Sequence, residues 1–228
     1  MSVTEIKNVR SQDSKKDKDI ELQKMPERVE RPRFLEKQQD EFTATQRGSA
    51  LHLLLEAVNI KVIQKEVEKH ELKNLPEFLT TQLLSEVERL IQEEFLPEKL
   101  ARGIDLSKLV AFYSSKLGLR LLASEKIQRE IPFNYCYDPG KVRKEWANAT
   151  GKIMVQGIID CAFMEAGQWV LVDYKTDYYR DTQARDEMLG GYKIQVDLYA
   201  EALESLTGIS VKEKIIALIT MKENINLK

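Results

Sequence analysis

Apolar residues in the first half of the chain recur at helical spacing in three segments. One such run starts at Gly48 and a second at Pro76. A third lies between Leu106 and Leu122, with Ser107 as a candidate N-cap. The apolar positions of the first two runs are Ala50, Leu51, Leu54, Leu55 and Val58, then Leu79, Leu83, Leu84, Val87, Leu90 and Ile91. Each run predicts an amphipathic helix.

The pattern changes from helix to strand after residue 123. Segments rich in Ile, Val, Met and aromatic residues predict strands over 124–134, 151–163 and 169–175. Residues 185–207 return to helical spacing before Gly208, a typical helix stop, and 211–221 predicts a last strand. Three antiparallel strands followed by a helix and a strand predict an α/β (α+β) fold, in which a mixed central sheet is flanked by helices.

The beginning of the chain differs from the rest in composition. Residues 11–24 are dense in charge and poor in apolar side chains, which disfavours a packed core there. We therefore expect 1–38 to be a partly mobile leader or linker and 39–228 to form the folded domain. Within that domain we expect a helical part over 39–123 and a sheet-containing part over 124–228.

Composition excludes several classes of protein. The formal net charge is −2, so any nucleic-acid partner has to be argued from local patches rather than from bulk charge. Cys136 and Cys161 lack the spacing of metal ligands, which argues against a structural zinc or Fe–S site and fits a reducing cytosol. No stretch of 18 apolar residues or signal peptide is visible.

Two aspartates fall at corresponding positions of a predicted hairpin. If Ala166-Gly167 forms a two-residue turn, Asp160 and Asp173 lie directly opposite each other, whereas a three-residue turn would offset them. Facing carboxylates repel unless a cation lies between them. Lys175 projects from the same strand face as Asp173. This trio predicts a divalent-metal site suited to phosphodiester hydrolysis; alternatively, two surface acids share Lys175 as a salt-bridge partner.

Further polar residues are candidates for the same site. Glu130 ends a strand segment that could pair beside Asp160 and would then face the same metal, although it could equally be a solvated acid at a strand edge. His52 could ligate a metal or contact a phosphate, or be a packed side chain. Tyr192, Gln195 and Tyr199 share one helical face, where they could contact DNA or simply pack in the core.

Together these motifs resemble the PD-(D/E)XK nuclease superfamily in its RecB-like branch, and within it the nuclease domains of AddAB-type helicase–nucleases. The similarity covers about residue 40 to the end of the chain. It rests on five motifs in the order typical of the family: Gly48-Ser-Ala-Leu-His52, Glu130-Ile-Pro-Phe133, Gly157-Ile-Ile-Asp160, Val172-Asp-Tyr-Lys-Thr-Asp177 and Tyr192-Lys-Ile-Gln195-Val-Asp-Leu-Tyr199. The resemblance implies a restriction-endonuclease-like core.

The resemblance also implies roles for individual residues. Mg²⁺, for which Mn²⁺ could substitute, would be bound by Asp160, Asp173, the backbone carbonyl of Tyr174 and His52. Glu130 would complete the shell directly or through water.

By the same resemblance, Lys175 would orient or help deprotonate the attacking water. Gln195 and Tyr199 would contact DNA and support the site, with Tyr192 on the same helix.

What the resemblance implies for function is a cytoplasmic bacterial deoxyribonuclease (exonuclease) domain. It would cut mainly single-stranded DNA within an ATP-dependent helicase–nuclease that serves double-strand break repair by homologous recombination. Its partners would be the helicase motor of a longer parent chain and an AddB-like subunit. The chain lacks the cysteines that hold an Fe–S cluster in some relatives, so no cluster is expected. The alternative is a non-catalytic DNA-binding or scaffolding domain of the same complex.

Overall fold

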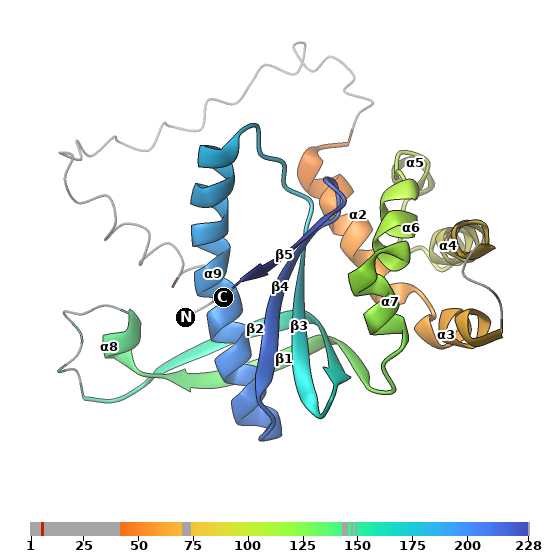
Figure 1. The fold of residues 1–228 in the computed structure, drawn as a ribbon. Helices are drawn as coiled ribbons and strands as arrows, with labels where there is room; N and C mark the ends of the chain where they lie inside the picture. Colours follow the sequence, from red (N-terminus) through yellow and green to blue (C-terminus); the bar gives the residue numbers. More distant parts are fainter. Residues whose placement is uncertain are drawn as a thin grey trace, which may run out of the picture.

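The fold is a mixed sheet with helices on both faces. A computed structural model describes residue 6 and residues 42–69, 74–142, 146, 148 and 150–227. Figure 1 shows the long helix α9 on one face of the sheet and helices α2, α6 and α7 on the other. This arrangement confirms the predicted sheet flanked by helices.

The sheet contains five strands in the order of the chain: β1 (Ile127–Tyr137), β2 (Ile153–Glu165), β3 (Gln168–Lys175), β4 (Val211–Leu218) and β5 (Glu223–Leu227). Strands β3 and β4 are parallel, and all other neighbours are antiparallel. Helix α9 (Thr182–Thr207) connects the two parallel strands and ends at Gly208, whose φ is 69°. The predicted stop at Gly208 and the predicted mixed sheet are both confirmed.

The remaining helices are α2 (Ala44–Ala57), α3 (Ile60–Lys69), α4 (Leu75–Gln92), α5 (Glu98–Ala101), α6 (Ser107–Ser114), α7 (Lys116–Leu122) and α8 (Pro139–Val142). Helix α2 starts with a capping box, in which the Thr43 side chain accepts from the backbone of Gln46 and the Gln46 side chain accepts from the backbone of Thr43. The predicted helix after Pro76 is confirmed as α4, which buries Leu79, Leu83 and other apolar residues on one face.

Two hydrophobic cores lie on opposite faces of the sheet. Val170 and Val172 of β3 pack with helices α2 to α7, whereas Trp169 and Leu171 pack with α9. Alternate residues of the strand therefore enter different cores, as the period of a buried strand requires. Because both faces are covered, β3 places its C-terminal residues deep between the two helical layers.

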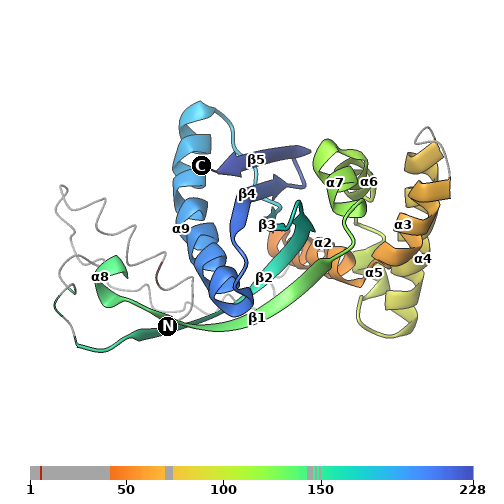
Figure 2. The same ribbon diagram turned by 60° about the horizontal axis from the view of Figure 1, so that its bottom comes forward.

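Strands β1 and β2 exchange faces partway along their length. Arg129 points toward α2, where it donates to the carbonyls of Leu55 and Val58 at 2.9 and 2.8 Å, but Phe133 packs in the α9 core. The change occurs at Glu130, which has a φ of 47° and forms no ladder pair with Asp160 although the register is the same on both sides. Figure 2 shows the resulting long, curved β1–β2 arm.

The region predicted as one helix between Leu106 and Leu122 is two helices. Ser115 has an extended ψ of 164°, ends α6, and caps α7 by accepting from Gly118 N at 3.1 Å. The expected cap Ser107 is instead the first residue of α6, and its N–H donates to Asp105. The helical period continues across the break, so periodicity alone does not reveal it. Helix α3 and strand β5 were also not predicted.

Most of the predicted leader, 1–38, lies outside the described residues. Ile6 is described, and its side chain is buried in the α9 core. The expectation of a partly mobile leader therefore stays a prediction. Within the described ranges, no helix is both long and apolar enough to cross a membrane.

Gly118 allows α6 and α7 to pack closely. A Cβ atom at this position would lie 2.2 Å from the carbonyl oxygen of Phe112. We therefore expect Gly118→Ala to lower the free energy of unfolding by about 2–3 kcal/mol, measured by urea denaturation. Gly190→Ala is the control, because its Cβ would meet nothing within 4 Å in α9; it should raise stability by up to about 1 kcal/mol. Equal effects of the two substitutions would contradict the packing argument.

Candidate active site

The β2–β3 hairpin has the predicted two-residue turn. Ala166 and Gly167 both have positive φ, 52° and 76°, as a type I′ turn requires. The pairing of Cys161 with Val172 confirms the predicted register, and the ladder ends at this pair. Asp160 and Asp173 occupy the next position of the same register, where the two strands separate.

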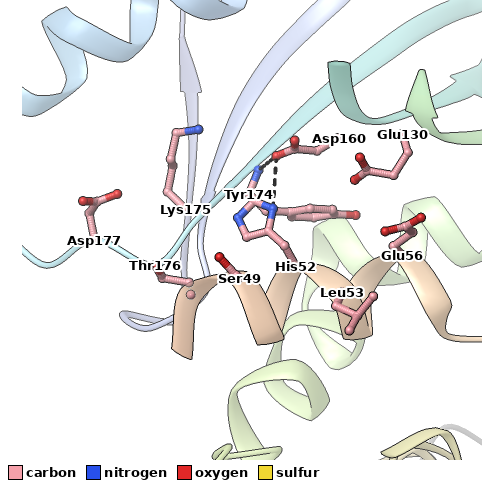
Figure 3. Close-up of a pocket in the computed structure, with 11 residues that line it drawn as sticks. Ser49, His52, Leu53, Glu56, Glu130, Asp160, Tyr174, Lys175, Thr176 and Asp177 are labelled. Atoms are coloured by element: carbon pink, nitrogen blue, oxygen red, sulfur yellow. Dashed lines mark hydrogen bonds and ion pairs between the residues drawn. The ribbon is translucent and has the colours of Figure 1, made fainter. Parts of the chain in front are cut away.

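Asp160 is positioned by the neighbouring strand and by helix α2. Its Oδ2 atom accepts from Tyr174 N at 2.8 Å and lies 3.9 Å from His52 Nδ1 (Figure 3). Burial, followed by the positive charge of Lys175, lowers the pKa of His52. At neutral pH the imidazole is therefore neutral, which is the form that binds metals. The structure thus places His52 beside Asp160, and its role as a metal ligand stays a prediction.

Asp173 is a buried carboxylate with two polar neighbours. Its Oδ2 atom lies 2.5 Å from Lys175 Nζ, and its Oδ1 atom accepts from Gln195 Nε2 at 3.2 Å. Within the described part of the chain, no group donates a well-aligned hydrogen bond to Oδ2. Burial raises the pKa of Asp173 to about 6, although the Lys175 charge opposes this shift. Burial therefore disfavours the charged form of Asp173, and the Lys175 charge offsets this cost only in part.

Glu130 of strand β1 lies near Asp160. Its positive φ turns the backbone out of the regular strand geometry opposite Asp160. Burial, followed by the charges of Asp160 and Glu56, raises the pKa of Glu130 to about 7. Glu56 was not predicted, although it lies one helical turn after His52 and that spacing alone could have identified it.

Helix α9 supports the acids from the opposite layer. Gln195 Nε2 also donates to Tyr199 Oη at 2.9 Å, and Tyr199 packs edge-on against Phe133. Tyr192 is buried, lies under Lys175 Nζ at 5.1 Å from its ring centroid, and donates to Asp177 Oδ2 at 2.5 Å. Gln195 and Tyr199 are therefore linked to Asp173 by hydrogen bonds, whereas Tyr192 contacts Lys175 and Asp177. Asp177 was missed as the partner of Tyr192.

A cavity of about 590 Å³ lies beside Asp160, His52, Glu130 and Lys175, and we call it the acidic cavity. It is lined by Gly48, Ser49, His52, Leu53, Glu56, Glu130, Asp160, Tyr174, Lys175, Thr176 and Asp177. Figure 3 shows Glu56 and Glu130 at one end, with Thr176 and Asp177 at the other. The lining therefore offers several hard oxygen donors, one neutral imidazole and one ammonium group.

The donors suit a hard divalent cation. Oxygen ligands are those that Mg²⁺ prefers, and a cation beside Asp160 and Asp173 would offset the desolvation that raises the pKa of both carboxyls. Among the described residues, no three His, Cys, Asp or Glu side chains form a ready-made metal cluster. A bound cation would therefore depend on a backbone carbonyl or water in addition to side chains.

A mixed sheet that places two acids and a lysine side by side at the edge of a cavity is typical of a class of phosphodiester-cleaving proteins, and sequence comparison agrees. The chain belongs to the PD-(D/E)XK nuclease superfamily, whose sequence pattern it matches over residues 25–222. The predicted fold class and the predicted family are therefore both confirmed.

Within the superfamily, the chain is similar to part of a longer bacterial protein, the first subunit of an ATP-dependent helicase/nuclease. It is 34% identical to the protein from Thermoanaerobacter sp. (strain X514) over 96% of the chain and 16% of the relative. For Bacillus mycoides (strain KBAB4) the identity is 31% over 100% and 18%, and for Clostridium novyi (strain NT) it is 29% over 100% and 17%. The chain therefore spans about a sixth of the length of these relatives.

The raised pKa of Glu130 predicts a pH-dependent stability. Its carboxyl binds its proton up to about pH 7 in the folded state, but only up to its ordinary value of 4.5 when unfolded. The metal-free chain should therefore lose stability as the pH rises between these values. Glu130→Gln should remove the part of this loss that is due to Glu130 and be about 1 kcal/mol more stable than wild type at pH 8, a value discounted for solvent screening.

Urea denaturation in EDTA at pH 4.5 and pH 8 would measure this difference. The two proteins should have similar free energies of unfolding at the lower pH, where Glu130 is protonated in the folded state. Glu88→Gln, on α4, is the control for a change of one surface charge. A constant difference between Glu130→Gln and wild type at both pH values would contradict the argument.

Proposed function

We propose that this chain is a Mg²⁺-dependent deoxyribonuclease domain that hydrolyses phosphodiester bonds of mainly single-stranded DNA. The observation that carries the proposal is that Asp160 and Lys175 line the acidic cavity while the buried Asp173 lies directly behind them, 2.5 Å from Lys175 Nζ. Burying two acids beside each other is costly without a cation, so a purely structural role does not account for the arrangement. The shared superfamily supports nuclease chemistry.

Four groups would hold the cation: the carboxylates of Asp160 and Asp173, the backbone carbonyl of Tyr174 and the neutral imidazole of His52. Glu130 would complete the shell directly or through a water molecule. A bound divalent cation supplies Lewis-acid polarisation of a phosphoryl oxygen and lowers the pKa of water. Mn²⁺ would substitute for Mg²⁺, because imidazole and carboxylate together suit both ions.

Lys175 is the group that acts beside the acids. Its ammonium is anchored by Asp173 Oδ2 at 2.5 Å and by the face of the Tyr192 ring. From this position the ammonium of Lys175 would orient the attacking water and stabilise the negative charge that develops on the phosphate.

Gln195 and Tyr199 hold Asp173 in place through a chain of two hydrogen bonds. In the proposed function they would also contact the DNA, while Tyr192 restrains Asp177 through a hydrogen bond. These residues are therefore positioning residues, whereas the acids and Lys175 act on the reacting atoms.

The proposed single-stranded substrate and the proposed partners are inferred from the names of the relatives. The relatives are named as helicase/nucleases, and because a helicase separates strands, a nuclease domain joined to one would receive unwound DNA. We infer that this chain works with a helicase motor in a longer protein and with an AddB-like partner, as an exonuclease in recombinational repair. The second candidate, a non-catalytic scaffold, is the outcome if the following test fails.

Asp173→Ala should abolish Mg²⁺-dependent cleavage of labelled single-stranded DNA, because it removes a carboxylate that holds the cation. Gel analysis of products would measure cleavage, calorimetry Mg²⁺ binding and circular dichroism the fold. Asp186→Ala, an exposed acid on α9, should retain wild-type activity as the matched control. Full activity of Asp173→Ala would refute the assignment. Absence of both cleavage and Mg²⁺ binding in the wild type would favour the scaffold.

Lys175→Ala should retain Mg²⁺ binding but lose turnover by about a hundredfold or more, because the acids remain and the ammonium does not. Single-turnover cleavage at saturating Mg²⁺ would measure the loss. Lys175→Met keeps the apolar stem over Tyr192 and should be equally inactive. Normal turnover in either variant would remove the catalytic role of Lys175.

A further inference from the structure

A second cavity adjoins the acidic cavity, and we call it the basic cavity. Its volume is about 490 Å³, and it is lined by Arg47, Gly48, Leu51, Lys108, Thr176, Asp177, Tyr178 and Thr220. It shares Gly48, Thr176 and Asp177 with the acidic cavity. Of these, Thr176 and Asp177 lie at the end of the acidic cavity that is opposite Glu56 and Glu130 (Figure 3). The two spaces therefore meet beside the proposed site of cleavage.

Helix α2 forms the ridge between the cavities. His52 and Glu56 line the acidic cavity, whereas Arg47 and Leu51 lie on the adjacent face and line the basic one. Gly48 lines both, and a Cβ atom there would lie 2.9 Å from Thr176 Oγ1. The helix can approach the end of β3 this closely because position 48 has no side chain. No side chain of the ridge therefore separates the two spaces at this point.

The two cavities differ in charge. Glu56, Glu130 and Asp160 place negative charge in the acidic cavity. This charge repels phosphate groups everywhere except next to a bound cation. The basic cavity contains the cationic groups of Arg47 and Lys108. Its one acid is Asp177, so the two cationic groups leave the lining with more positive than negative charge. A polyanion that enters the acidic cavity would therefore extend more favourably toward the basic cavity than toward Glu56.

An exposed aromatic side chain completes the lining. Tyr178 is 69% exposed, although large apolar groups are usually covered. It lies three residues after Lys175, in the segment that leads from β3 to α9. Aromatic faces beside cationic groups are the combination with which proteins bind single-stranded nucleic acid, because bases stack on the ring while the cations bind phosphates.

We propose that the basic cavity is the track along which the DNA strand extends from the cleavage site. Arg47 and Lys108 bind phosphates adjacent to the scissile one, and Tyr178 stacks on an unpaired base. This inference rests on the proposed nuclease function and adds where its substrate lies. It also explains why the substrate would be single-stranded DNA, because paired bases are not free to stack on Tyr178.

Fluorescence anisotropy with a labelled single-stranded oligonucleotide tests the phosphate contacts. EDTA prevents cleavage during the measurement. Arg47→Ala/Lys108→Ala should weaken binding by about tenfold at low salt and reduce the slope of log affinity against log salt by about 1.4, or about 0.7 for each lost contact. Lys61→Ala/Lys65→Ala, on α3, makes the same charge change outside the basic cavity and should bind as wild type does.

The stacking contact is tested separately with two variants of Tyr178. Tyr178→Ala should weaken binding by about tenfold, with little change in the salt slope, and Tyr178→Phe should restore it because the ring is kept. Equal affinities of wild type, Tyr178→Ala and Arg47→Ala/Lys108→Ala would overturn the proposal. So would an equal loss in the Lys61→Ala/Lys65→Ala control, because bulk charge would then account for the binding.

Cleavage assays separate this proposal from the proposed function. If the wild type cleaves DNA and the basic-cavity variants bind as wild type does, the track is refuted and the nuclease function stands. If the wild type does not cleave but these variants bind DNA more weakly than the control, the track is supported and the nuclease function fails. No binding of single-stranded DNA by the wild type would overturn the track.

Discussion

The energetic cost of burying Asp173 is the constraint on which the rest of the site depends. A carboxylate without exposure to water is strongly disfavoured unless opposite charge and hydrogen-bond donors surround it. Lys175 and Gln195 supply these from the same strand and from α9. Even so, the pKa of Asp173 stays raised, so the compensation is incomplete. A cation-binding role explains why the incomplete compensation is tolerated, since a bound ion would complete it.

This constraint explains the layered architecture around β3. The parallel pairing of β3 with β4 requires a crossover connection, and α9 provides it. The crossover places Gln195 against Asp173 and Tyr192 beside Lys175. On the opposite face, α2 carries His52 to Asp160. Helices distant in sequence therefore support the acids because the sheet between them has both faces covered.

The face exchange of β1 and β2 has a comparable role. A regular ladder would hold Glu130 and Asp160 within the sheet, but the positive φ of Glu130 releases both from pairing. Backbone strain of this kind is typical of functional sites, where the surrounding structure compensates for it. Arg129, which anchors β1 to the end of α2, holds the distorted strand in place.

Features that depend on short-range order could be predicted from the sequence. The α9 stop at Gly208 and the hairpin register that makes Asp160 and Asp173 neighbours are of this kind, because each depends on adjacent residues and on periodicity. Features that depend on packing between distant segments became visible in the folded structure alone. The break at Ser115 leaves the helical period unchanged, and the approach of His52 to Asp160 requires α2 to cross the sheet at one particular position. Such contacts depend on the shape of the whole core, which local periodicity does not encode.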